Sequence, residues 1–218
     1  MEILHQAEHM VNYDLIPKRT ALINVDMQNR FVEGYPISAP DGLAVLERIN
    51  TVAAACRKAG ILVIHTSHVF RPDGSNIGRL AEFDPPVKTG ILNKGSQAAA
   101  LHKSLAVGER DVLLDKARFG AFYGTDLELI LRTHGIDTVI IAGIASNVCC
   151  DTTAREAAVR DFRVLFLSDG TATHGIEGLS ASEIQRATCA TLGLLFAQVL
   201  TADEVIAKIA GGAKSETA

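Results

Sequence analysis

The chain has 218 residues, of which 48% are hydrophobic and 21% are charged, and its formal net charge is -4. This composition is typical of a soluble globular protein with one sizeable core, and the small negative charge argues against nucleic-acid binding. No apolar run is long enough to cross a bilayer, and the first residues lack the apolar segment of a secretory signal. We therefore predict one cytoplasmic domain over residues 19–210, with a lead-in over residues 1–18 and a flexible tail over residues 211–218.

Short apolar runs alternate with amphipathic or capped segments along the chain. The runs predicted to be strands cover residues 21–25, 61–65, 111–114, 138–142, 163–167 and 195–200. Helices are predicted over residues 41–59, 98–105, 125–133, 148–160, 180–192 and 202–210. Alternation of this kind predicts a doubly wound α/β fold, with a six-stranded, mostly parallel sheet between two layers of helices.

A long segment over residues 67–97 is rich in glycine, proline and charged residues. Loops of this length are uncommon in compact domains and often act as lids or binding loops. Its cations are Arg71, Arg79, Lys88 and Lys94. Each of them alone is typical of a solvated surface charge, but together they are candidates for neutralising an anionic substrate.

Three chemically informative residues follow predicted strands: Asp26, Lys116 and Cys149. The carboxyl ends of parallel strands meet at one edge of the sheet, where open α/β folds bind ligands. Ser146 and Asn147 predict a helix N-terminus there, and unpaired N–H groups at such an end lower the pKa of a thiol. Cys150 is one residue along and faces a different direction, so spacing alone does not decide which cysteine faces the ligand.

An aspartate, a lysine and a thiol together can perform nucleophilic catalysis. Asp26 can accept the thiol proton, and Lys116 can stabilise negative charge. Histidine is the usual partner of a catalytic cysteine, and His65, His68 and His174 lie near predicted strand ends. The first two are three residues apart without an acid at ligand spacing, so we predict no metal site.

Other patterns exclude further cofactors and cross-links. The segment DMQNRF after the first strand has no GxGxxG fingerprint, so we predict no dinucleotide cofactor. The four cysteines are Cys56, Cys149, Cys150 and Cys189. Without CxxC spacing or a high cysteine density they are expected to be reduced, with the first and last in the core.

The segments NVDMQNRF, DKARFGAFYGTDL and GIASNVCCDTTAREA resemble, in this order, motifs of the isochorismatase-like cysteine hydrolases. The resemblance covers roughly residues 19–208. It implies a six-stranded parallel sheet, an Asp26–Lys116–Cys149 triad rather than one with Cys150, and a cis peptide bond before Ala145. It also implies a homo-oligomer, commonly a dimer or a tetramer.

The predicted function is hydrolysis of a C–N amide or ureido bond of a small molecule through a thioester on Cys149, with release of ammonia or an amine. Backbone N–H groups of Ala145 and Cys149 are predicted to form the oxyanion hole. The predicted substrate-binding residues are Phe31, Arg71, Arg79, Phe122 and His174. No nucleic-acid or membrane partner is expected, and a reactive thiol should be alkylated quickly near neutral pH.

Two alternatives remain open. One is a vinyl ether hydrolase of the isochorismatase type, which shares the aspartate and lysine but does not depend on a cysteine. The other is a catalytically silent oligomer that binds a small ligand. Within the amidases, a nicotinamidase is less favoured because no aspartate–histidine metal cluster follows the first strand.

Overall fold

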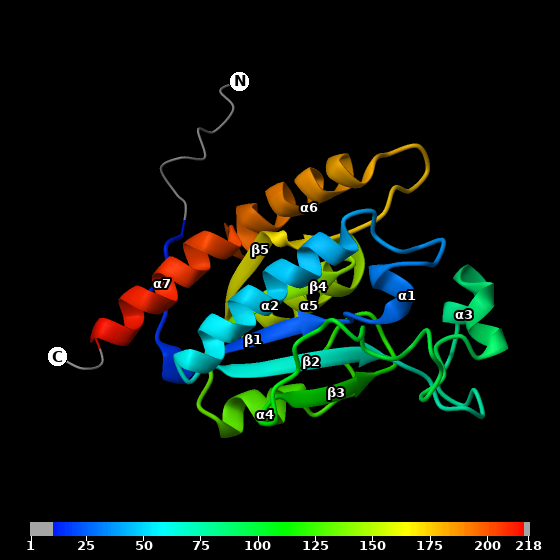
Figure 1. Ribbon diagram of the computed structural model, residues 1–218, viewed down its shortest axis with the longest axis horizontal. Helices are drawn as coiled ribbons and strands as arrows, with labels where there is room; N and C mark the ends of the chain where they lie inside the picture. The colour runs from blue at the N-terminus through cyan, green and yellow to red at the C-terminus, as the bar shows by residue number, and fades with distance from the viewer. Residues whose placement is uncertain (1–10, 216–218) are drawn as a thin grey trace.

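The computed structural model describes residues 11–215, including side chains as far as residue 212. Its sheet has six strands in the order β3-β2-β1-β4-β5-β6, and every neighbouring pair is parallel. The strands are β1 (Thr20–Val25), β2 (Leu62–His68), β3 (Val112–Lys116), β4 (Thr138–Ile144), β5 (Arg163–Ala172) and β6 (Gln198–Leu200). The predicted α/β fold is confirmed (Figure 1).

Helices cover both faces of the sheet. They are α1 (Asn29–Val32), α2 (Gly42–Lys58), α3 (Leu80–Phe83), α4 (Leu127–Thr133), α5 (Asp151–Ala158), α6 (Ala181–Leu195) and α7 (Ala202–Ser215). One apolar cluster joins α2 and α7 to the sheet, and a second joins α4, α5 and α6 to its other face. Strands β1 and β4 are buried along their whole length, which explains their nearly continuous apolar sequences. Within residues 11–215, no helix has the length and apolar character needed to span a membrane.

The sheet contains a topological switch between β1 and β4. From β1 the chain proceeds outward through β2 to β3, and from β4 it proceeds the other way through β5 to β6. The connections after these two central strands therefore leave toward opposite faces, which opens a crevice at their carboxyl ends. Figure 1 shows α1 and α3 beyond the arrowheads of the strands, on the side of this crevice.

The predicted helix over residues 98–105 is wrong. This segment forms turns and runs beside the end of β1, where Asn29 N–H donates to Ala100 O and His102 N–H donates to Met27 O. The local helical propensity is overridden because these backbone groups pair with a distant segment.

Several element boundaries also differ from prediction. Strand β5 continues to Ala172 with an irregular register, and α7 continues to Ser215, five residues past its predicted end at 210. Residues 216–218 of the predicted tail and residues 1–10 of the predicted lead-in lie outside the described residues. The rest of the lead-in contacts the body, since Tyr13 packs on the core of α2 and α7 and its carbonyl accepts a hydrogen bond from Lys208.

Candidate active site

Asp26 terminates β1 in a left-handed backbone conformation, with φ = 52°. The adjacent strand approaches closely there, because a Cβ atom on Gly143 would overlap the carbonyl oxygen of Val25. The Asp26 side chain is fully buried, and its Oδ1 accepts a hydrogen bond of 2.6 Å from Thr66 Oγ1 at the neighbouring strand end. The same Thr66 hydroxyl also accepts a hydrogen bond from the Asp26 backbone N–H, so one residue of β2 holds both the backbone and the carboxylate of Asp26.

Lys116 ends β3 and is the buried cation of the site. Its Nζ lies 2.7 Å from Asp26 Oδ2, 3.0 Å from Arg118 O and 2.8 Å from Phe119 O. These three acceptors match the three N–H groups of an ammonium. Burial is the largest single influence on Lys116 and lowers its pKa, but the charge of Asp26, its hydrogen bond and the nearby cysteines together outweigh burial, so the pKa is raised. Lys116 is therefore a charged group that is held in one position.

Cys149 follows β4 on a turn that begins at a cis peptide bond between Ile144 and Ala145, as the resemblance implied. Residues Ser146–Cys150 form a single π-helical turn, which continues into α5. Cys149 Sγ, a carboxylate oxygen of Asp26 and a ring nitrogen of His68 all lie within 4.8 Å of one another. Cys150 is buried in the apolar cluster beneath the turn. The geometry thus brings Asp26, Lys116 and Cys149 together.

The predicted N-cap is wrong, because Ala145 occupies that position. Ser146 is buried, and its hydroxyl has no hydrogen-bond partner among the described residues. Asn147 instead accepts a hydrogen bond from Thr173 Oγ1 of the segment after β5. Asn147 therefore ties this turn to the segment after β5, and neither small polar residue caps a helix.

The predicted lowering of the Cys149 pKa is also wrong. Burial raises the pKa of this thiol to about 12, because Cys149 is only 6% exposed. The positive charge of Lys116 opposes the rise, the charge of Asp26 and its hydrogen bond add to it, and the Ala145 N–H opposes it more weakly. Desolvation of the thiolate outweighs the helix-end effect, so the free protein holds a protonated thiol beside a carboxylate.

This protonation state predicts the pH profile of alkylation. The rate at which iodoacetamide modifies Cys149 should be low at pH 7 and should rise about tenfold per pH unit up to about pH 10, following the thiolate fraction. Peptide mass spectrometry after timed labelling measures it, with Cys149→Ala as the blank. An alkylation rate that levels off below pH 8 would contradict the raised pKa and support the reactive thiol expected from the sequence.

Helix α5 is hydrogen-bonded to the loop that supplies the acceptors of Lys116. Thr153 Oγ1 donates to Cys149 O at 2.7 Å and accepts from Ala121 N–H at 3.1 Å. Glu156 accepts from Phe122 N–H at 3.0 Å, and its carboxylate occupies the space that a side chain on Gly120 would need. The cysteine turn and the lysine loop are therefore positioned relative to each other by one helix.

Thr153→Val should destabilise the protein and lower its activity, because it removes the hydrogen bond between α5 and the loop at Ala121. The valine keeps the shape but leaves the buried Ala121 N–H without an acceptor, which costs about 1–3 kcal/mol of unfolding free energy. The activity of the site should fall about tenfold as the loop shifts. Thr152→Val is the matched control, since the Thr152 hydroxyl donates to Val148 O one turn earlier and, within residues 11–215, to no other segment. Equal effects of both substitutions on denaturant unfolding and on turnover would contradict a positioning role.

Sequence reasoning named His68 only as a strand-end histidine and did not consider Thr66, Thr153 or Glu156. His68 is 3% exposed, and burial, aided by the charge of Lys116, lowers its pKa to about 3, so the ring is neutral. It ends β2 beside Lys116, its register partner on β3. The signal in the sequence was the position of His68 at the end of a strand, but the acid and thiol near it come from segments far away in the chain.

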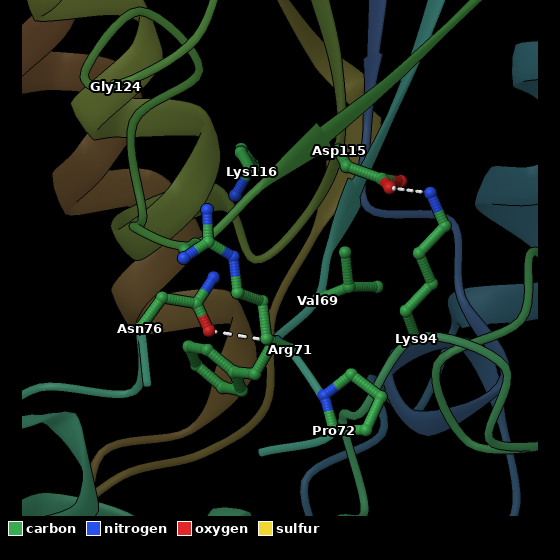
Figure 2. Close-up of a pocket in the computed structure, with 10 residues that line it drawn as sticks. Val69, Arg71, Pro72, Asn76, Lys94, Asp115, Lys116 and Gly124 are labelled. Carbon is green, nitrogen blue, oxygen red and sulfur yellow. Dashed lines mark hydrogen bonds and ion pairs between the residues drawn. The ribbon is translucent and has the colours of Figure 1, made fainter. Parts of the chain in front are cut away.

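A cavity of about 320 Å³ opens beside Lys116, within the size range of small-molecule sites. Figure 2 shows Arg71, Asn76 and Lys116 around one side of it, and the ion pair of Lys94 with Asp115 on the other. Asp26 and Cys149 are not among its lining residues, so the cavity touches the triad at Lys116.

Of the five predicted substrate-binding residues, the structure places only Arg71 in the lining of this cavity. Phe31 is half-buried against apolar clusters, and Arg79 is exposed at the start of α3. Phe122 packs against Phe162 in the core, with ring centroids 5.8 Å apart. His174 is half-buried after β5, where burial lowers its pKa.

Curated proteins resemble this chain over most of its length. It is 32% identical to ureidoacrylate amidohydrolase RutB of Methylorubrum extorquens over 187 residues, which cover 76% of this chain and 75% of that protein. It is 30% identical to nicotinamidase 3 of Arabidopsis thaliana over 196 residues, which cover 89% of this chain and 90% of that protein.

The chain also resembles a solved hydrolase structure and matches a family profile. A cysteine hydrolase from Pseudomonas syringae pv. phaseolicola superposes with a TM-score of 0.87 at 33% identity, covering 94% of this chain and 99% of that one. The profile of the isochorismatase domain matches residues 20–204, from the start of β1 into α7. The chain therefore belongs to the isochorismatase family of hydrolases.

Proposed function

We propose that this protein is an amidohydrolase that cleaves the C–N bond of a small amide or ureido compound, with Cys149 as the nucleophile. The observation that carries the proposal is the placement of a buried Asp26–Lys116 ion pair beside the Cys149 thiol. A protonated thiol next to a carboxylate is arranged for proton transfer at the moment of attack. The names of both curated relatives, an amidohydrolase and a nicotinamidase, support C–N chemistry.

The proposed reaction begins with transfer of the Cys149 thiol proton to Asp26. The sulfur then forms a bond to the substrate carbonyl carbon, and the oxyanion accepts hydrogen bonds from the N–H groups of Ala145 and Cys149. The C–N bond breaks as Asp26 returns the proton to the departing nitrogen, which leaves as ammonia or an amine. Asp26 next takes a proton from water, and the resulting hydroxide attacks the thioester. The C–S bond then breaks, and Asp26 gives the proton to the departing sulfur, which regenerates the thiol.

Lys116 has an electrostatic role in this proposal. Its three N–H groups are already occupied by Asp26 and two loop carbonyls, so it orients the carboxylate and offsets the charge that develops on sulfur. The side chain need not contact the substrate to do so.

The cavity favours an acidic substrate. Arg71 is exposed in its wall beside Asn76, whereas the charge of Lys94 is offset by its ion pair with Asp115. Since a guanidinium binds carboxylates with paired hydrogen bonds, we propose a ureido or N-carbamoyl acid whose carboxylate lies near Arg71. A cytoplasmic location and a dimeric or tetrameric assembly stay predictions from the sequence.

The test is ammonia release from a panel of ureido acids, N-carbamoyl acids, short amides and nicotinamide, with isochorismate in parallel. Rapid quench and tandem mass spectrometry of the accepted substrate should find an acyl group on Cys149 and none on Cys150. Turnover of isochorismate alone, with no acylated cysteine, would contradict the proposal and indicate the vinyl ether reaction.

A further inference from the structure

His68 carries a buried polar atom that the proposed hydrolysis does not use. Its Nε2 is buried and has no hydrogen-bond partner among the described residues. Leaving such an atom unsatisfied costs about 1–3 kcal/mol and suggests a ligand. The backbone of His68 is held on both sides by Gln28. The His68 backbone N–H donates to Gln28 Oε1 at 2.7 Å, and Gln28 Nε2 donates to the His68 backbone carbonyl at 3.1 Å.

The imidazole ring is also fixed in orientation. The rings of Phe70 and Phe119 form T-shaped contacts with it, with ring centroids 5.1 Å and 5.9 Å away. Because the ring is neutral, a nitrogen lone pair is available to a metal ion. His68 therefore presents a buried ring in a defined orientation, with one nitrogen able to act as a ligand.

Two further ligand types lie beside it. A ring nitrogen of His68, a carboxylate oxygen of Asp26 and the sulfur of Cys149 are mutually within 4.8 Å. A point equidistant from three atoms at that separation lies about 2.8 Å from each, whereas zinc binds nitrogen and sulfur at about 2.0–2.3 Å. An inward movement of roughly 0.5–0.8 Å per ligand would therefore complete the coordination.

We propose that Asp26, His68 and Cys149 form a binding site for a thiophilic divalent cation, best matched by Zn²⁺, and that the bound cation inactivates the nucleophile. The set of one thiolate, one imidazole and one carboxylate with an open fourth position suits zinc, whereas Mg²⁺ and Ca²⁺ prefer oxygen ligands alone. The binding does not depend on the proposed hydrolase activity, but the inactivation rests on it.

The site also balances its charge. Binding forms a zinc–sulfur bond and releases the thiol proton to solvent. Asp26 and the thiolate then contribute two negative charges against Lys116 and the dication, which leaves one net positive charge. A hydroxide or a substrate carboxylate at the fourth position would neutralise it. Asp26 can keep its bonds to Thr66 and Lys116, since each carboxylate oxygen has two lone pairs.

The experiment is a Co²⁺ titration of the full, untagged chain under reducing conditions, followed by displacement with Zn²⁺. A thiolate–cobalt charge-transfer band in the near ultraviolet should saturate at one equivalent and disappear with Zn²⁺. This band separates the site from weak binding elsewhere, including at His5 and His9 in the N-terminal segment, because those ligands lack sulfur.

Variants then test each ligand. Cys149→Ala should remove the band, and His68→Gln should weaken binding about 10- to 100-fold. His134→Gln and Cys189→Ala are matched controls at an exposed histidine and a half-buried free cysteine, and both should bind as the wild type does. A band that persists in Cys149→Ala, or an unchanged affinity in a folded His68→Gln, would overturn the site. If His68→Gln does not fold, protection of Cys149 from alkylation by one equivalent of Zn²⁺ in the wild type decides instead, and no protection overturns it.

Ammonia release separates the two proposals. One equivalent of Zn²⁺ should stop turnover, and a chelator should restore it. Cation binding by a protein that hydrolyses nothing in the substrate panel would overturn the hydrolase proposal and leave the metal site in place. Full activity with the cation bound would overturn the proposed inactivation.

Discussion

Cys149→Ala is expected to lower kcat/KM for the accepted amide by about 10⁴-fold or more, because no other group can form the thioester. Cys149→Ser should be nearly as inactive, since a hydroxyl is a far weaker nucleophile than a thiolate. The measurement is steady-state ammonia release at several pH values, after circular dichroism has shown that each variant is folded.

Cys150→Ala is the matched control for that result. Cys150 is as deeply buried as Cys149 and adjacent to it, so both substitutions remove a similar amount of buried sulfur. Each should lower the free energy of unfolding by about 1 kcal/mol, but only Cys149→Ala should lose turnover. Similar activity losses in the two variants would mean that packing of the turn, and not nucleophilic attack, explains the effect.

Lys116→Met is expected to abolish activity and to lower the free energy of unfolding by about 3–5 kcal/mol. The methionine fills most of the space but leaves the fully buried Asp26 carboxylate without its cation, and an uncompensated buried charge is strongly destabilising. In a chain of 218 residues this corresponds to a fall in Tm of roughly 10 °C. Denaturant unfolding and calorimetry measure the change.

Two comparisons isolate the cause of that loss. Adding Asp26→Asn to Lys116→Met removes the orphaned charge, so stability should partly return while activity stays absent. Lys94→Met breaks an exposed Lys–Asp pair of the same type, with Asp115, and should hardly change Tm. A double variant no more stable than Lys116→Met, or equal losses in Lys94→Met and Lys116→Met, would contradict the buried-charge explanation.

The sequence by itself determined the six-stranded sheet and the approximate positions of its strands. Residues 138–142 are read as a central strand because a strand buried on both faces needs apolar residues at successive positions, and the observed β4 is buried throughout. Since parallel strands share an edge at their carboxyl ends, Asp26, Lys116 and Cys149 could be assigned to one crevice without coordinates. The choice of Cys149 over Cys150 came from the family resemblance, because spacing alone left it open.

Tertiary structure decided what depends on distant contacts. The segment over residues 98–105 forms no helix because its backbone pairs with residues after β1, and Phe122 lies in the core because α4 and α5 close over it. The Cys149 pKa is raised because burial, which no local pattern reports, outweighs the helix end. His68 meets Asp26 and Cys149 only where three strands end together, so the proposed cation site, which the spacing of the histidines argued against, depends on the fold.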